Sequence, residues 1–118
     1  MRLAALALCL ALSACGDPDR VPSALDGDLE NGRLLLRQFP CGSCHAIPGV
    51  AAANGRVGPP LAGVASRAYL AGVLPNTPEN MASFIRAPSA VDPLTAMPDL
   101  GVTEKHARDM VAYLYTLR

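Results

Sequence analysis

The sequence predicts a small all-α domain in which about three main helices are joined by long loops. Its 118 residues suffice for one domain, and no stretch shows convincing strand alternation. The 11 prolines and 10 glycines gather between stretches of helical periodicity, which indicates many turns. Hydrophobic residues make up 51% but aromatic residues only 4%. The core is therefore thin in large side chains, and we expect another group to complete it.

The first residues are typical of an export signal. A short positive start is followed by the apolar run 3–12, which is too short to span a bilayer but fits a secretory signal. The run ends in Leu-Ser-Ala-Cys at 12–15, which resembles the lipobox of bacterial lipoproteins, where cleavage precedes a lipidated cysteine. A plain signal or an uncut tail is the alternative, but Leu12 lies where plain signal peptidase needs a small residue. We therefore predict a lipoprotein-type signal peptide at 1–14 and a lipid on Cys15.

The chain after the signal divides into a tether and a domain. Residues 16–27 are polar and rich in proline and glycine, so we expect 15–27 to be the lipidated cysteine and tether, and 28–118 the folded domain. Removal of 1–14 takes Arg2 from ten cations and leaves nine against ten anions, a net charge of −1. This balance argues against nucleic-acid binding and against a polybasic membrane patch. Export and lipidation predict the periplasmic side of a bacterial membrane.

The first helix is predicted over residues 28–39, with Asp26 or Asp28 near its start and Pro40 ending it. Its apolar stripe consists of Leu29, Gly32, Leu35, Leu36 and Phe39.

Directly after Pro40 comes Cys41-Gly42-Ser43-Cys44-His45, the C-x-x-C-H pattern of covalent haem c attachment. Two thiols at this spacing can each add to one haem vinyl group, and the adjacent imidazole is then held as the proximal iron ligand. A thioredoxin-like pair needs a βαβ context, and a bare disulfide leaves His45 without a role. A zinc site needs four ligands, and the other exported candidates are only His106 and Cys15. We predict one covalently attached haem c.

The remaining chain alternates loops and helices. Residues 46–76 are predicted to be largely loop, and Thr77-Pro78-Glu79 predicts a helix start with threonine as N-cap, the helix ending near Arg86. Residues 89–102 are predicted to be loop. Thr103 is predicted to cap the last helix, whose apolar positions are Ala107, Met110, Val111, Leu114 and Leu117.

Over about residues 28–118 the sequence resembles a class I, mitochondrial-type cytochrome c. The attachment motif, Gly58-Pro59-Pro60-Leu61 and Thr95-Ala96-Met97-Pro98 carry the resemblance. It implies a small fold of helices and loops wrapped around one haem. It also implies that the Pro59 carbonyl accepts a hydrogen bond from His45 and that Met97 is the distal iron ligand.

The resemblance assigns further residues to supporting roles. It implies that Arg67 lies near a haem propionate and that Thr95 pins the ligand loop by a hydrogen bond toward a propionate. The last helix, with Met-Val-Ala-Tyr-Leu at 110–114, is expected to pack an aromatic ring on Gly32 of the first helix. Phe84 is expected near the haem. Judged by residue type, Met81 and Met110 are predicted to be core and His106 to be solvated surface.

These features predict electron transfer by a single haem c in a respiratory chain, without small-molecule substrate chemistry. Ligands on both axial positions leave no open site on the iron. Redox proteins are the expected partners, with a terminal oxidase favoured as acceptor by family analogy. The alternative is a fixed electron-relay subunit of a membrane-bound dehydrogenase. One C-x-x-C-H motif argues against a two-haem peroxidase, and a gas sensor needs a distal ligand that leaves easily.

Overall fold

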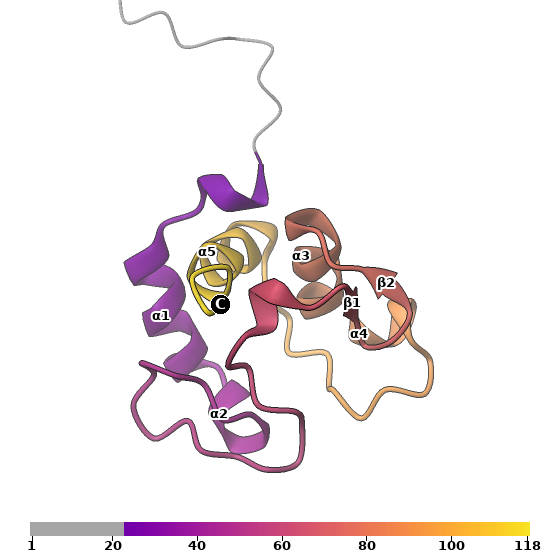
Figure 1. Cartoon of the computed structure of the whole chain (residues 1–118), viewed down its shortest axis with the longest axis horizontal. Coiled ribbons are helices and arrows are strands. Elements are labelled where there is room, and N and C mark those ends of the chain that lie inside the picture. Colours follow the sequence, from indigo (N-terminus) through magenta and orange to yellow (C-terminus); the bar gives the residue numbers. More distant parts are fainter. Residues whose placement is uncertain (1–22) are drawn as a thin grey trace, which may run out of the picture.

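The computed structural model describes residues 23–118, so the predicted signal peptide and Cys15 lie outside it. Helices dominate, which confirms the all-α prediction (Figure 1). The helices are α1 (Leu29–Gln38), α2 (Cys41–Cys44), α3 (Pro78–Arg86), α4 (Pro88–Val91) and α5 (Glu104–Leu114), with 3₁₀ turns at Ala24–Asp26 and Val64–Ser66 and strands β1 (Tyr69–Leu70) and β2 (Leu74–Pro75). None of the described helices is long and apolar enough to cross a membrane.

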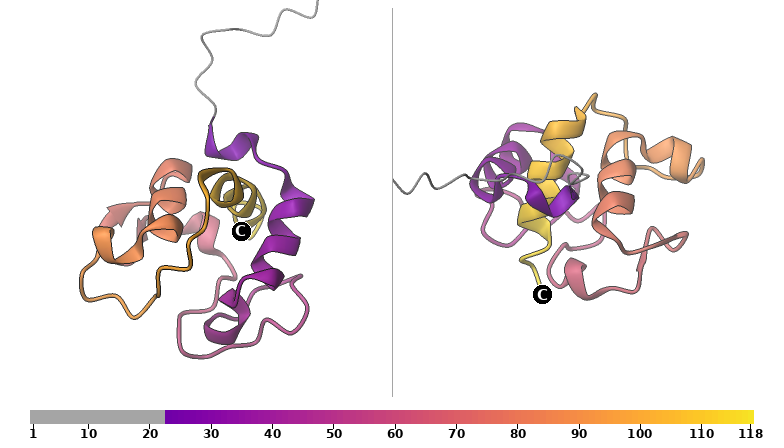
Figure 2. Two further views of the ribbon diagram at one scale, coloured as in Figure 1. Left: turned by 180° about the vertical axis from the view of Figure 1, so that it is seen from behind. Right: turned by 90° about the horizontal axis from the view of Figure 1, so that it is seen from above.

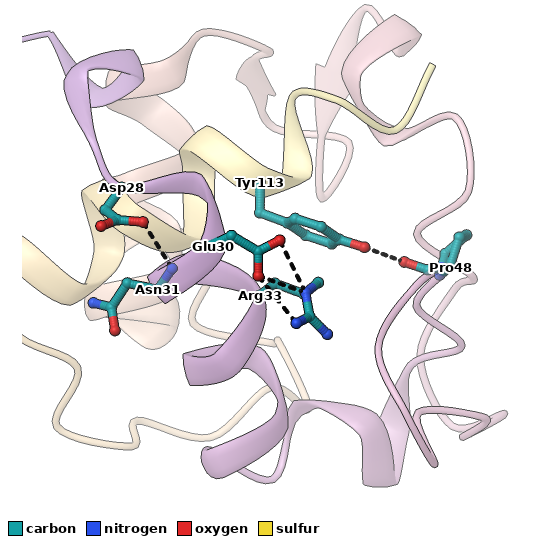
Figure 3. Close-up of polar contacts among 6 residues, drawn as sticks. All are labelled: Asp28, Glu30, Asn31, Arg33, Pro48 and Tyr113. Atoms are coloured by element: carbon teal, nitrogen blue, oxygen red, sulfur yellow. Dashed lines mark hydrogen bonds and ion pairs between the residues drawn. The ribbon is translucent and has the colours of Figure 1, made fainter.

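Helix α5 is the centre of the fold, with α1 on one side and α3 on the other (Figures 1 and 2). Met110 and Val111 on α5 are fully buried. The crossing with α1 is close because Gly32 has no side chain: a Cβ there would lie 1.8 Å from the Asp109 carbonyl oxygen. The atoms nearest Gly32 are thus backbone atoms of α5. Tyr113 is the aromatic residue that the resemblance placed against Gly32. Its hydroxyl donates a hydrogen bond to the Pro48 carbonyl at 2.7 Å (Figure 3).

Helix α1 is fixed at its N-terminus by two carboxylates. Asp28 is the N-cap and accepts from the Asn31 N–H at 2.9 Å (Figure 3). The buried Asp109 of α5 accepts from the Asp28 N–H at 2.9 Å, from Asn31 Nδ2 at 2.7 Å and from Lys105 Nζ at 2.7 Å. Burial alone would raise the pKa of Asp109, but these hydrogen bonds outweigh it and the pKa lies below its ordinary value. The carboxylate therefore joins α1 to α5 in its ionised form.

The folded part begins earlier than the predicted boundary at residue 28. Ser23 forms a capping box with Asp26 around the first 3₁₀ turn, and Ala24 is buried. Gly27 lies so close to α5 that a Cβ there would meet the Arg108 carbonyl oxygen at 2.3 Å. Residues 23–27, which the sequence analysis includes in the tether, thus pack on the last helix.

Local signals located the other helices well. Thr77 Oγ1 accepts from the Asn80 N–H at 3.1 Å, and Thr103 Oγ1 accepts from the His106 N–H at 3.2 Å, as the capping predictions required. The predicted loops contain extra short elements. Strands β1 and β2 pair antiparallel with Leu70 opposite Leu74, and the turn α4 begins at Pro88, which is buried.

Candidate haem site

A cavity of ≈ 410 Å³ lies between the helices and the two long loops. Its wall combines buried side chains of α1, α3 and α5 with residues 57–61 and 92–100. The apolar side chains of this wall include Leu36, Leu61, Val64, Leu70, Met81, Phe84, Ile85, Leu100, Met110 and Leu114. Phe84 is at the cavity, as the sequence led us to expect. A large apolar cavity in a domain with few aromatic residues fits a flat hydrophobic cofactor.

The C-x-x-C-H motif occupies one edge of this cavity. Cys41 and Cys44 are the first and last residues of the single helical turn α2, and both line the cavity as free thiols. Burial raises the pKa of the Cys41 thiol. Helical geometry thus presents both sulfur atoms on one side of the turn.

His45 follows α2 in an extended conformation and lines the same cavity. Its Nδ1 lies 2.7 Å from the Pro59 carbonyl oxygen. A carbonyl oxygen only accepts, so Nδ1 carries the proton, and in the neutral imidazole the lone pair is then on Nε2. This contact is the one that the resemblance implied, and it prepares the imidazole to bind a metal through Nε2.

Gly58 brings the proline loop onto the motif. A Cβ at this position would lie 2.4 Å from His45 Cε1, so a side chain would push the imidazole away. The Gly58 N–H also donates to the Cys44 carbonyl at 2.8 Å. The glycine therefore permits the close approach that lets Pro59 reach His45.

Arg67 lies at the cavity wall, where its Nη2 donates to the carbonyls of Pro60 and Ala62. The guanidinium thus braces the loop that carries Pro59. A position at the cavity is compatible with the propionate contact that the resemblance implied.

Met97 reaches the same cavity from the loop that follows α4. The Asp92 carboxylate accepts from the Leu94 N–H at 3.0 Å, and Thr95 Oγ1 accepts from the Met97 N–H at 3.2 Å. Thr95 thus restrains the backbone at Met97, and its contact with a propionate stays a prediction. Two further methionines, Met81 and Met110, line the cavity as buried helix residues, as their core assignment required.

One sequence interpretation was only partly right, for a residue that does not line the cavity. His106 is half-buried, not fully solvated: its ring packs edge-on against Phe39, with centroids 6.0 Å apart, and its Nδ1 is buried without a hydrogen-bond partner among residues 23–118. In the sequence it lies in the polar part of the last helix, but Phe39, directly after α1, packs against its ring.

Tyr69 and Val57, at 61% and 79% exposure, line the mouth of the cavity. Val57 was missed because it lies in a loop without periodicity.

The donor set fits a covalently bound haem. Two thiols, an imidazole with a free Nε2 lone pair and a thioether line one apolar cavity. Imidazole and thioether are the axial pair of electron-transferring haem proteins, and paired thiols form the thioether links. Fold and site together define a c-type cytochrome.

Comparison with known proteins places the chain in its family. Residues 29–118 match the cytochrome c family model, so the chain belongs to the cytochrome c family. It is a class I monohaem cytochrome c and carries one covalently bound haem c. Over 90 residues, or 74% of its length, it is 31% identical to cytochrome c oxidase subunit 2 of Alkalihalophilus pseudofirmus. The chain spans 25% of that relative's length.

Proposed function

We propose that this electron-transfer cytochrome is a membrane-tethered carrier that donates single electrons to a terminal oxidase. In the proposed site, Cys41 and Cys44 form the two thioether links, and His45 and Met97 are the axial ligands. The observation that carries this assignment is the convergence of all four side chains on one apolar cavity. When bound, the haem supplies a reversible one-electron couple at its iron.

The surrounding residues hold this ligand set in place. Pro59 fixes the tautomer and the ring orientation of His45. Thr95 limits the freedom of the Met97 backbone. Arg67 braces the proline loop and adds a positive charge beside the cavity. With both axial positions taken by side chains, the protein transfers electrons and does not transform a substrate.

The proposed location follows from the N-terminal sequence. The Leu-Ser-Ala-Cys signature at 12–15 supports export and lipidation of Cys15. We propose that the residues between Cys15 and Ser23, where the described fold begins, serve as a short tether. A short tether keeps the carrier at the periplasmic face of the membrane, close to membrane-bound oxidases.

One observation favours a terminal oxidase as acceptor, and a second describes the surface through which a partner would make contact. The similar protein of Alkalihalophilus pseudofirmus is itself a subunit of cytochrome c oxidase. The exposed residues that line the cavity are also uncharged: Pro40, Val57, Pro59, Tyr69, Ala71, Ala96 and Pro98. Such a rim suits contact with an uncharged partner surface, because strong electrostatic steering needs opposed charges.

The test is oxidation of the reduced protein by detergent-solubilised membranes of the producing organism. Inhibitor-sensitive oxidation that depends weakly on ionic strength is expected. Val57→Lys at the rim is expected to slow it. Leu34→Lys, on an exposed part of α1 that does not line the cavity, serves as the matched control. Stoichiometric copurification with a dehydrogenase, without oxidase turnover, would contradict the proposed acceptor.

A further inference from the structure

Asn76 is half-buried between β2 and α3 and uses every polar atom of its side chain. Its Nδ2 donates to the Val64 carbonyl and to the Arg67 carbonyl, both at 2.8 Å. Its Oδ1 accepts from the Tyr115 hydroxyl at 2.9 Å. The carbonyls require the NH₂ group on their side, so the amide has one orientation.

The two carbonyls belong to a segment of the cavity wall. Val64 begins the second 3₁₀ turn and Arg67 caps it, and both line the cavity, whereas Asn76 does not. The Ala65 N–H donates to the Leu117 carbonyl at 3.1 Å, a second link from this turn to the C-terminal segment. The wall segment is therefore held from behind, away from the haem.

The phenol of Tyr115 is suited to this contact because it stays protonated. Burial and the negative charge of Glu79 raise its pKa. The hydroxyl is thus a donor to Asn76 throughout the neutral range.

The chain of contacts continues to the proposed iron ligand. Arg67, whose carbonyl Asn76 holds, donates from its side chain to the carbonyl of Pro60. The preceding carbonyl, that of Pro59, accepts from His45. Two prolines and two glycines lie within residues 58–63, and proline lacks an N–H, so this loop has few backbone donors. The N–H groups of Gly58 and Leu61 hold its first half on the carbonyls of Cys44 and Ala46. The position of its second half depends on the turn that Asn76 holds.

We propose that Asn76, oriented by Tyr115, is a positioning residue that holds the 58–67 wall against the haem and so sets the orientation of His45. This role rests on the proposed ligation by His45. Loss of the Asn76 amide frees the wall, admits water and lets the Arg67 charge move away. Water and the loss of a nearby positive charge both favour the ferric state.

The experiment uses the full holoprotein and three variants: Asn76→Ala, Tyr115→Phe and Asn80→Ala. Asn80 is the matched control, because its amide donates to the Pro75 carbonyl at 2.9 Å and does not reach the 58–67 wall. The measurements are the reduction potential, the exchange of the His45 Nδ1 proton with D₂O by NMR, and the near-infrared charge-transfer band of the ferric iron–methionine bond.

Asn76→Ala is expected to lower the reduction potential and to accelerate Nδ1 proton exchange roughly tenfold, as for loss of one net hydrogen bond. Tyr115→Phe is expected to change both quantities in the same direction by a smaller amount. It tests the proposal if Asn76→Ala does not yield a folded holoprotein. The positioning role would be overturned if Asn76→Ala had the same reduction potential and the same His45 Nδ1 proton exchange rate as Asn80→Ala. A lower melting temperature of Asn76→Ala would not rescue it. A near-infrared band missing from the wild type would contradict the proposed ligand set instead.

Discussion

Two regions of the molecule are packed differently. One is the crossing of α1 with α5, and the other is the loop wall, formed by residues 57–61 and 92–100 around the cavity. At the crossing, backbones touch at Gly32, the buried Asp109 joins the two helices, and Met110 is fully buried. In the loop wall, Val57 is 79% exposed and Leu94, beside the ligand loop, is 94% exposed. The inner face of the wall lines a cavity.

This difference indicates where the fold obtains its stability. The helix pair is stabilised by contacts within the chain, whereas apolar side chains of the loop wall, such as Leu61 and Leu100, line the cavity. Haem c supplies the missing apolar surface, and its two thioether links restrict the unfolded chain. We therefore expect the helix pair to act as a scaffold and the loops to depend on the haem for their order.

Breaking the haem attachment is expected to have the largest effect. Cys41→Ala combined with Cys44→Ala should give a poorly ordered product, because the cavity then has no covalent haem to complete its core. Circular dichroism and thermal melting provide the measurement. Cys15→Ser, which alters only the proposed lipidation site, should keep the haem spectrum. Sharp cooperative melting of the double variant with full helicity would contradict this expectation.

Opening the helix crossing should have the second-largest effect. Gly32→Ala is expected to destabilise the holoprotein by about 2–3 kcal/mol, because its Cβ meets the Asp109 carbonyl and forces the helices apart. Gly72→Ala in the loop region has open space but a φ of +73°, and should cost only about 1 kcal/mol. Denaturant melts measure both. Equal losses would show that the close crossing is not important.

Acid should weaken the helix pair through Asp109. Its folded-state pKa lies below the unfolded value of about 3.9, so its contribution is present above that pH and is lost as pH falls through the folded pKa. Asp109→Asn is expected to cost about 2 kcal/mol at pH 7 and to flatten the loss of stability below about pH 4. Melting temperatures between pH 3 and 7 test this. An unchanged acid dependence in the variant would contradict the role of Asp109.

Loosening the ligand loop should have the smallest effect. Thr95→Val removes the acceptor for the Met97 N–H while keeping the side-chain shape. Added imidazole should then displace the proposed methionine ligand about tenfold more readily, as for one lost hydrogen bond. Thr116→Val, which removes a hydrogen bond to the Tyr113 carbonyl far along α5, should leave imidazole binding unchanged. Equal binding to both variants would show that Thr95 does not restrain the loop.

Local signals explain which features could be predicted from the sequence. The Thr77 and Thr103 caps act within three residues, so their helices were located correctly. The haem motif was equally clear, because covalent attachment requires one fixed spacing. Asp109 and Asn76 gave no such signal: the Asp28 N–H that Asp109 binds lies 81 residues away, and Tyr115 lies 39 residues from Asn76. His106 was misjudged for the same reason, because Phe39 covers it from another helix.

The identity of the distal ligand can be tested most directly by the near-infrared charge-transfer band that marks a ferric iron–methionine bond. Three methionines line the cavity, and only Met97 lies on a loop, while Met81 and Met110 are buried in helices. Met97→Ala should abolish the band, lower the reduction potential and open the iron to carbon monoxide. Met81→Ala and Met110→Ala should keep the band and destabilise the fold by about 2–5 kcal/mol. A band that survives in Met97→Ala and disappears in Met81→Ala would contradict ligation by Met97.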